Sequence, residues 1–105
     1  MINKIGVHSL VFAPDWTRES AELAINSAAE IGFDHIEVVI FDPSTTDARM
    51  TVSLAKKAGI EITAGMALNP AADLSSENPE IAKKGEAVVA DCISVTRDLG
   101  ASMLG

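Results

Sequence analysis

Three residues of the 105-residue sequence could contact a small polyhydroxylated ligand, and each also has a structural interpretation. His8 could hydrogen-bond a hydroxyl, or it could be a structural residue of a strand. Trp16, the only tryptophan, could pack its ring on the C–H face of a sugar, or it could cap the top of the fold. Gly65 has no side chain and so permits close approach of backbone or ligand.

A fourth polar residue, Glu37, lies in an apolar run between Ile36 and Val38. A carboxylate in such surroundings must be paired or must reach water. We favour a structural ion pair inside the fold; the other interpretation is a carboxylate that points inward below a ligand. The segment over about 66–78 is long for a loop and predicts a wall or lid of a binding site.

Motifs of several other kinds of site are missing from the sequence. No Gly-x-Gly-x-x-Gly follows the first apolar segment, and there is no Walker-type Gly-Lys-Ser/Thr. Ser9 lacks the context of a nucleophile elbow. His8 and His35 are too far apart in the chain to form a helical pair of metal ligands. We therefore predict neither catalytic residues nor metal ligands within this chain.

A recurring order of helix, glycine and strand must position the candidate residues. Gly32, Gly59 and Gly100 each close a helical pattern, and glycine just past a helix end readily adopts a left-handed conformation. Apolar, β-branched segments predict strands at 4–12, 34–41 and 60–64, with a fourth beginning at 101–104. Helical spacing of apolar residues predicts helices at about 18–31, at about 47–58 and from residue 79 onward.

Local signals support these helix boundaries. Thr17 is a suitable N-cap for the first helix, and Asn78 precedes Pro79, a residue type favoured at the first helical position. The third helix has an apolar stripe that contains Cys92, so we interpret this cysteine as a core residue.

The order β-α-β-α-β-α-β predicts an α/β fold with a parallel sheet, because right-handed crossovers bring successive strands together. A complete (β/α)8 barrel, or TIM barrel, needs eight strands and about 250 residues. We therefore expect residues 1–105 to form one partial TIM-barrel domain, namely its first three and a half βα units. In such folds ligands bind at the carboxyl ends of the strands, where His8, Trp16 and Gly65 are expected.

Composition narrows the class of protein. Hydrophobic residues make up 48% of the sequence and charged residues 22%, as in ordinary globular proteins. The formal net charge of -7, with scattered lysines and arginines, argues against nucleic-acid binding. No apolar run is long enough to span a membrane, and a single cysteine without a secretion signal favours the cytoplasm.

Several stretches together resemble the D-tagatose/D-psicose 3-epimerase family of the xylose isomerase-like barrels. They cover the whole chain: KIGVH at 4–8 with Trp16 downstream, IGFDHIEV at 31–38, GIEITAG at 59–65, DLSSENP at 73–79 and LGASMLG at 99–105. The last stretch resembles the approach to a glycine pair at the end of the fourth strand and adds Gly105 to the candidate site.

This resemblance implies a metal-dependent sugar isomerase, most specifically a ketose 3-epimerase. In that family one glutamate removes the proton at C3 of a ketose, giving a cis-enediolate, and another returns a proton on the opposite face. A divalent metal, with Mn²⁺ expected and Mg²⁺ or Co²⁺ as alternatives, stabilises the negative charge. These groups come from later strands, so the chain alone should be inactive.

For this chain the resemblance implies a sugar-binding wall of His8, Trp16, Gly65 and Gly105, in a protein that assembles as a homo-oligomer. His8 stands where the family usually has an aromatic residue, so the particular ketose is left open. Two alternatives remain: another xylose isomerase-like enzyme of the hydroxypyruvate isomerase or inosose dehydratase type, and a non-catalytic half-barrel that serves as a binding module.

Overall fold

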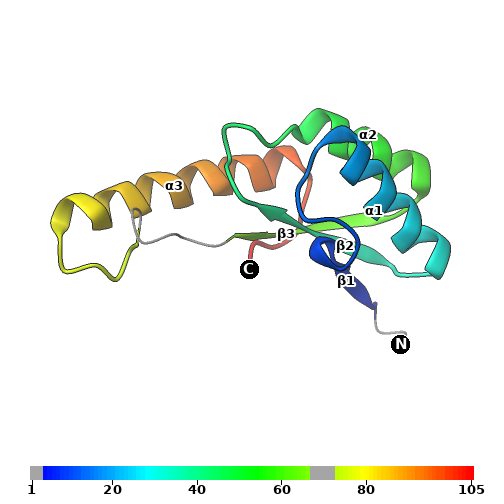
Figure 1. Ribbon diagram of the computed structural model, residues 1–105, viewed down its shortest axis with the longest axis horizontal. Coiled ribbons are helices and arrows are strands. Elements are labelled where there is room, and N and C mark those ends of the chain that lie inside the picture. The colour runs from blue at the N-terminus through cyan, green and yellow to red at the C-terminus, as the bar shows by residue number, and fades with distance from the viewer. Residues whose placement is uncertain (1–3, 67–72) are drawn as a thin grey trace.

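The computed structural model describes residues 4–66 and 73–105 and has an α/β fold (Figure 1). Three parallel strands form one sheet in the order β1-β2-β3, and the helices lie on one side of it. The elements are β1 (Gly6–His8), a 3-10 helix η1 (Ser9–Val11), α1 (Arg18–Ile31), β2 (His35–Ile40), α2 (Ala48–Ala58), β3 (Glu61–Met66) and α3 (Pro79–Asp98). The predicted parallel α/β arrangement is confirmed.

The register of the sheet sets which residues are neighbours across strands. His8 pairs with Glu37 between β1 and β2, and Val39 pairs with Gly65 between β2 and β3. On the other side of β3, Ala64 forms a parallel bridge with Leu104. The chain after α3 therefore takes the place of a fourth strand, as predicted, although among the described residues its pairing is limited to this bridge.

The first strand is shorter than the predicted segment 4–12, and that prediction is wrong at its carboxyl end. β1 ends at His8 because the side-chain Nδ1 of His8 accepts a hydrogen bond from the backbone N–H of Leu10 at 3.1 Å. This contact caps η1, and the N–H groups of Phe12 and Ala13 then bond to the carbonyl of Ser9. A local hydrogen bond to the His8 side chain therefore takes the place of the backbone hydrogen bonds that would have continued the strand.

The helix boundaries follow the predicted caps closely. Thr17 caps α1 through a bond from the Ser20 N–H, and Asn78 caps α3 through a bond from the Glu80 N–H. α2 starts one residue later than predicted, because the carboxylate of Asp47 serves as its N-cap. All three glycines predicted to close helices have positive φ: Gly32 107°, Gly59 74° and Gly100 66°.

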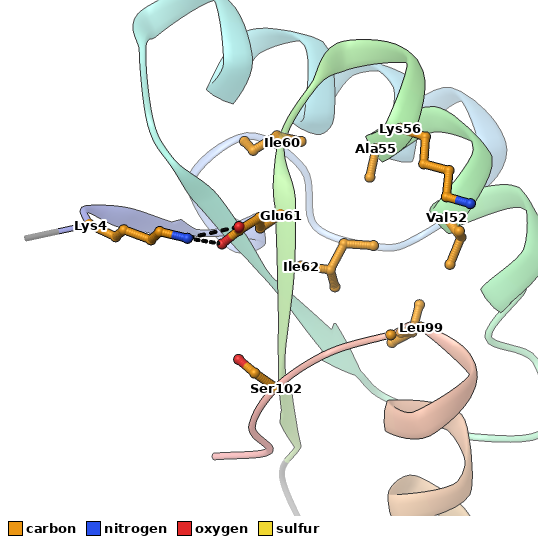
Figure 2. A pocket seen from close by; sticks show the side chains of 10 residues that line it. Lys4, Val52, Ala55, Lys56, Ile60, Glu61, Ile62, Leu99 and Ser102 are labelled. Atoms are coloured by element: carbon orange, nitrogen blue, oxygen red, sulfur yellow. Dashed lines mark hydrogen bonds and ion pairs between the residues drawn. The ribbon is translucent and has the colours of Figure 1, made fainter.

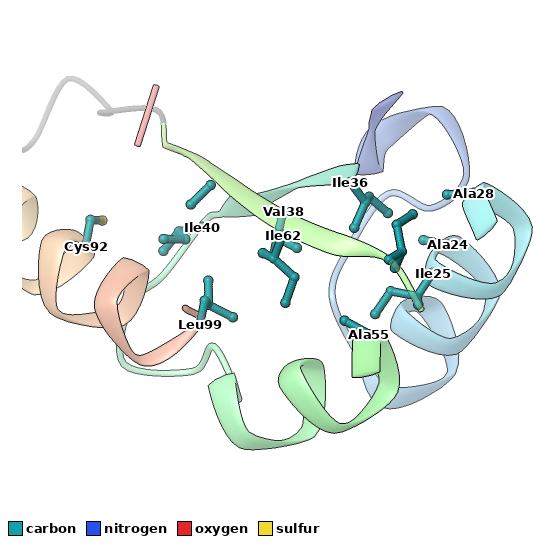
Figure 3. Close-up of a cluster of buried hydrophobic side chains, with 12 residues drawn as sticks. Ala24, Ile25, Ala28, Ile36, Val38, Ile40, Ala55, Ile62, Cys92 and Leu99 are labelled. Carbon is teal, nitrogen blue, oxygen red and sulfur yellow. The ribbon is translucent and has the colours of Figure 1, made fainter. Parts of the chain in front are cut away.

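One hydrophobic core lies between the sheet and the three helices (Figure 3). It joins alternate residues of β2 and β3 to small or branched side chains of the helices: Ala24, Ile25, Ala28, Ile36, Val38, Ile40, Ala55, Ile62, Ala64, Cys92 and Leu99. Cys92 is 1% exposed, which confirms it as a core residue. Burial, and after it the charge of Asp91, raises the pKa of its thiol. Because side chains alternate along a strand, Glu37 faces away from Ile36 and Val38 and shares the uncovered side of the sheet with His8.

No helix among residues 4–66 and 73–105 is long and apolar enough to cross a membrane.

Candidate functional site

A hollow of about 230 Å³ lies near the carboxyl ends of the strands and contains three of the four predicted site residues. His8 is the last residue of β1, Gly65 lies near the end of β3, and Gly105 follows on the bridge segment. Its other lining residues are Leu10, Glu37, Val39, Phe41 and Met66. The position agrees with the rule that ligands bind at the carboxyl ends of parallel strands.

The imidazole of His8 is held at both nitrogens. Nδ1 accepts the N–H of Leu10 at 3.1 Å, so in the neutral ring the proton lies on Nε2. Nε2 lies 3.3 Å from Oε1 of Glu37, and the two side chains are 41% and 39% exposed. The hollow therefore presents a hydrogen-bond donor next to a carboxylate, and both remain accessible to a ligand.

Glu37 is the residue that the sequence interpretation underrated. We expected an ion pair inside the fold, but the carboxylate instead lies against the imidazole of His8 in the lining of the hollow, where both side chains are partly exposed. A Cβ added to Gly65 would lie 2.5 Å from Oε1 of Glu37. Gly65 thus leaves the space that the Glu37 carboxylate occupies. The alternation of Glu37 with the buried residues Ile36 and Val38 was the signal that it faces away from the helices.

Trp16, the fourth predicted site residue, lies in a neighbouring hollow of about 440 Å³. Val39 and Phe41 line both hollows. The indole Nε1 donates to Oγ1 of Thr51 on α2 at 2.8 Å, and that hydroxyl donates to the carbonyl of Asp47. Trp16 is therefore anchored to the start of α2, and its contact with a sugar stays a prediction.

A larger hollow, of about 550 Å³, lies at the opposite end of β3 (Figure 2). It is bordered by α2 and by the chain that follows α3, with Ile62 and Leu99 among its apolar lining. Both carboxylate oxygens of Glu61 lie 2.8 Å from Nζ of Lys4. This hydrogen bond, followed by the attraction of the same charge, raises the pKa of Lys4 above its ordinary 10.5. We interpret this hollow as a packing gap between α2 and the end of α3, because it lies at the amino ends of the strands.

The described part of the chain does not fit a bound metal ion. Within residues 4–66 and 73–105, no three His, Cys, Asp or Glu side chains lie together as a ligand set. His8 and Glu37 supply only two such groups to this hollow. The predicted lid at 66–78 falls partly outside the described residues, since 67–72 are not among them.

Comparison with known proteins finds sugar epimerases over nearly the whole chain. The L-ribulose 3-epimerase of Methylomonas sp. (strain DH-1) is 34% identical over 94% of this chain and 35% of its own length. The ketose 3-epimerase of Arthrobacter globiformis is 32% identical over 94% of this chain and 34% of its own length. The crystal structure of D-allulose 3-epimerase from Methylomonas sp. in complex with D-allulose superposes with a TM-score of 0.92, at 34% identity, over 96% of this chain and 35% of that one. No protein-family model matches the chain.

The fold and these matches together define the class: part of a (β/α)8 barrel, similar to the corresponding third of sugar epimerase structures. More specifically, the chain is homologous to the ketose 3-epimerases, so the recognition made from its motifs is confirmed. The relatives are isomerase-class enzymes. The chain spans about a third of their length, 35% for the first of them.

Proposed function

We propose that the complete protein carrying this chain is a ketose 3-epimerase. The observation that carries the proposal is the match at TM-score 0.92 and 34% identity to an epimerase structure with D-allulose bound. In the proposed reaction a base removes the proton at C3 of a ketose, a cis-enediolate forms, and a proton returns on the opposite face. The acid and base groups are expected beyond Gly105, and so are the ligands of the divalent metal, for which Mn²⁺ is the expected ion.

This chain would supply one wall of the sugar site. His8 offers an N–H and Glu37 offers acceptor oxygens, while Gly65 and Gly105 keep the hollow open for a close approach. Phe41, which is 56% exposed, gives the same hollow an apolar side that suits the C–H groups of a sugar. The mixture of a few polar groups with apolar surface is typical of small-molecule sites.

The activity is tested by incubating the complete protein with D-allulose, D-fructose or L-ribulose in D₂O, with and without Mn²⁺. We expect each accepted ketose to be converted to its C3 epimer with deuterium incorporated at C3, which NMR would show. Conversion to an aldose, or loss of water from the substrate, would assign the protein to another reaction of the barrel group. The absence of any conversion with Mn²⁺, Mg²⁺ and Co²⁺ would contradict the proposal.

Assembly into a homo-oligomer and residence in the cytoplasm are further parts of the proposal. They are supported by the resemblance and by the cysteine content of the sequence. Light scattering after size-exclusion chromatography of the complete protein would measure the first, and cell fractionation would measure the second.

A further inference from the structure

The two polar groups in the hollow have complementary and fixed roles. His8 is a donor at Nε2, because its Nδ1 already accepts the Leu10 N–H. The carboxylate of Glu37 is an acceptor, and it sits over Gly65 where no side chain competes for the space. The hollow thus presents one donor and one acceptor side by side.

The contact between these two groups leaves them able to bind a third. The separation of Nε2 and Oε1 is 3.3 Å, which is longer than the usual 2.7–3.2 Å or so for an N–H···O bond. Both side chains are about two-fifths exposed, on the side that opens into the hollow. A ligand atom can therefore approach both of them at once.

A hydroxyl is the common sugar group that matches such a pair, because it both accepts and donates. A carbonyl or phosphate oxygen would only accept and would meet the Glu37 carboxylate unfavourably. We infer that His8 and Glu37 together recognise one hydroxyl of the ketose, with His8 donating to it and Glu37 accepting from it. The inference deepens the proposed function and rests on it, and it makes Glu37 a specificity-determining residue.

The test compares a ketose that the complete protein accepts with its monodeoxy analogues at C1, C4, C5 and C6. For each analogue we take the ratio of kcat/KM for the ketose to kcat/KM for the analogue. We expect this ratio to be about 10 to 100 for one analogue in the wild-type protein, since a hydrogen bond to a charged group is lost. In His8→Phe and in Glu37→Leu that one ratio should shrink to within about threefold, while the other three ratios stay as they were. A role confined to folding would not change the ratio at one position only.

Two further variants act as controls. Glu61→Gln removes the carboxylate at the opposite end of the same sheet and should keep the wild-type ratio. Glu37→Gln keeps the shape of the side chain, so it provides a folded protein if Glu37→Leu is unstable, and it should give an intermediate ratio. The inference is overturned if no analogue is discriminated by the wild-type protein, or if the discrimination survives in either His8→Phe or Glu37→Leu.

Binding measured by calorimetry separates this inference from the proposed function. If the ketose binds but is not converted, the proposed function fails, and the ratio of the dissociation constants of ketose and analogue decides the inference. If the ketose does not bind at all, both are overturned.

Discussion

Two glycines of the sheet each make room for a titratable side chain of β2, with different consequences. At the amino end, a Cβ on Gly6 would overlap the ring of His35. Nearer the carboxyl end, a Cβ on Gly65 would meet Oε1 of Glu37. The His35 ring is rigid, and its Nδ1 is buried without a hydrogen-bond partner in the described part of the chain. The Glu37 carboxylate is flexible and half-exposed.

The difference indicates that one face of the sheet has an amino end made by packing and a carboxyl end that opens into the hollow of the proposed sugar site. At the amino end a glycine lets an aromatic ring pack closely, and Lys4 pairs with Glu61 in solvent. At the carboxyl end a glycine lets a carboxylate turn toward His8 and a hollow. Substitutions at the first end should therefore change stability, and those at the second should change the handling of substrate.

Gly6→Ala should have the largest effect. The added methyl group cannot coexist with the His35 ring, so the strand or the ring must move, at a cost of about 1–3 kcal/mol in the free energy of unfolding. Denaturant unfolding would measure this. The double variant Gly6→Ala/His35→Ala removes the overlap and should recover part of the loss. A Gly6→Ala variant as stable as the wild type would contradict the packing account.

Trp16→Ala tests whether the ring contacts the sugar or only anchors the loop. With a sugar contact, the loss of positioning energy of about 1–3 kcal/mol lowers kcat/KM roughly 5- to 150-fold. Thr51→Val is the matched control, since it removes the acceptor of the indole N–H but keeps the ring. If both variants lower the melting temperature while kcat/KM per folded molecule stays within about twofold, the anchor is the only role.

Gly65→Ala should affect activity more than stability. Its methyl group displaces only the far end of the flexible Glu37 side chain, so we expect less than about 1 kcal/mol in unfolding but a fall of roughly 10-fold in kcat/KM. In a Glu37→Leu background the same substitution should add little further loss, because the displaced carboxylate is already absent. Full additivity of the two effects would show that Gly65 acts independently of Glu37.

The Lys4–Glu61 pair should have the smallest effect, since both side chains are exposed. Because the pKa of Lys4 is raised in the folded state, the pair stabilises the fold below the ordinary pKa of 10.5, and its contribution is lost as the pH rises through the raised value. The difference in melting temperature between the wild type and Lys4→Met should therefore vanish at high pH. A difference that persists there would have another origin, such as the packing of the lysine stem.

Sequence patterns predicted the elements better than the details of the site. Thr17 and Asn78 carry local capping information, so α1 and α3 begin where expected. β1 was predicted too long because the bond from the Leu10 N–H to His8 depends on a rotamer, which periodicity does not encode. The role of Glu37 depends on the register between β1 and β2, and a single strand pattern cannot supply that register.

The account is tested most directly by a crystal structure of the complete protein with a bound ketose such as D-allulose. We expect the sugar at the carboxyl ends of the strands, with one hydroxyl oxygen within hydrogen-bonding distance of both Nε2 of His8 and the carboxylate of Glu37. A sugar bound in the hollow beside Lys4 and Glu61, or one that leaves His8 and Glu37 in contact only with each other, would contradict it.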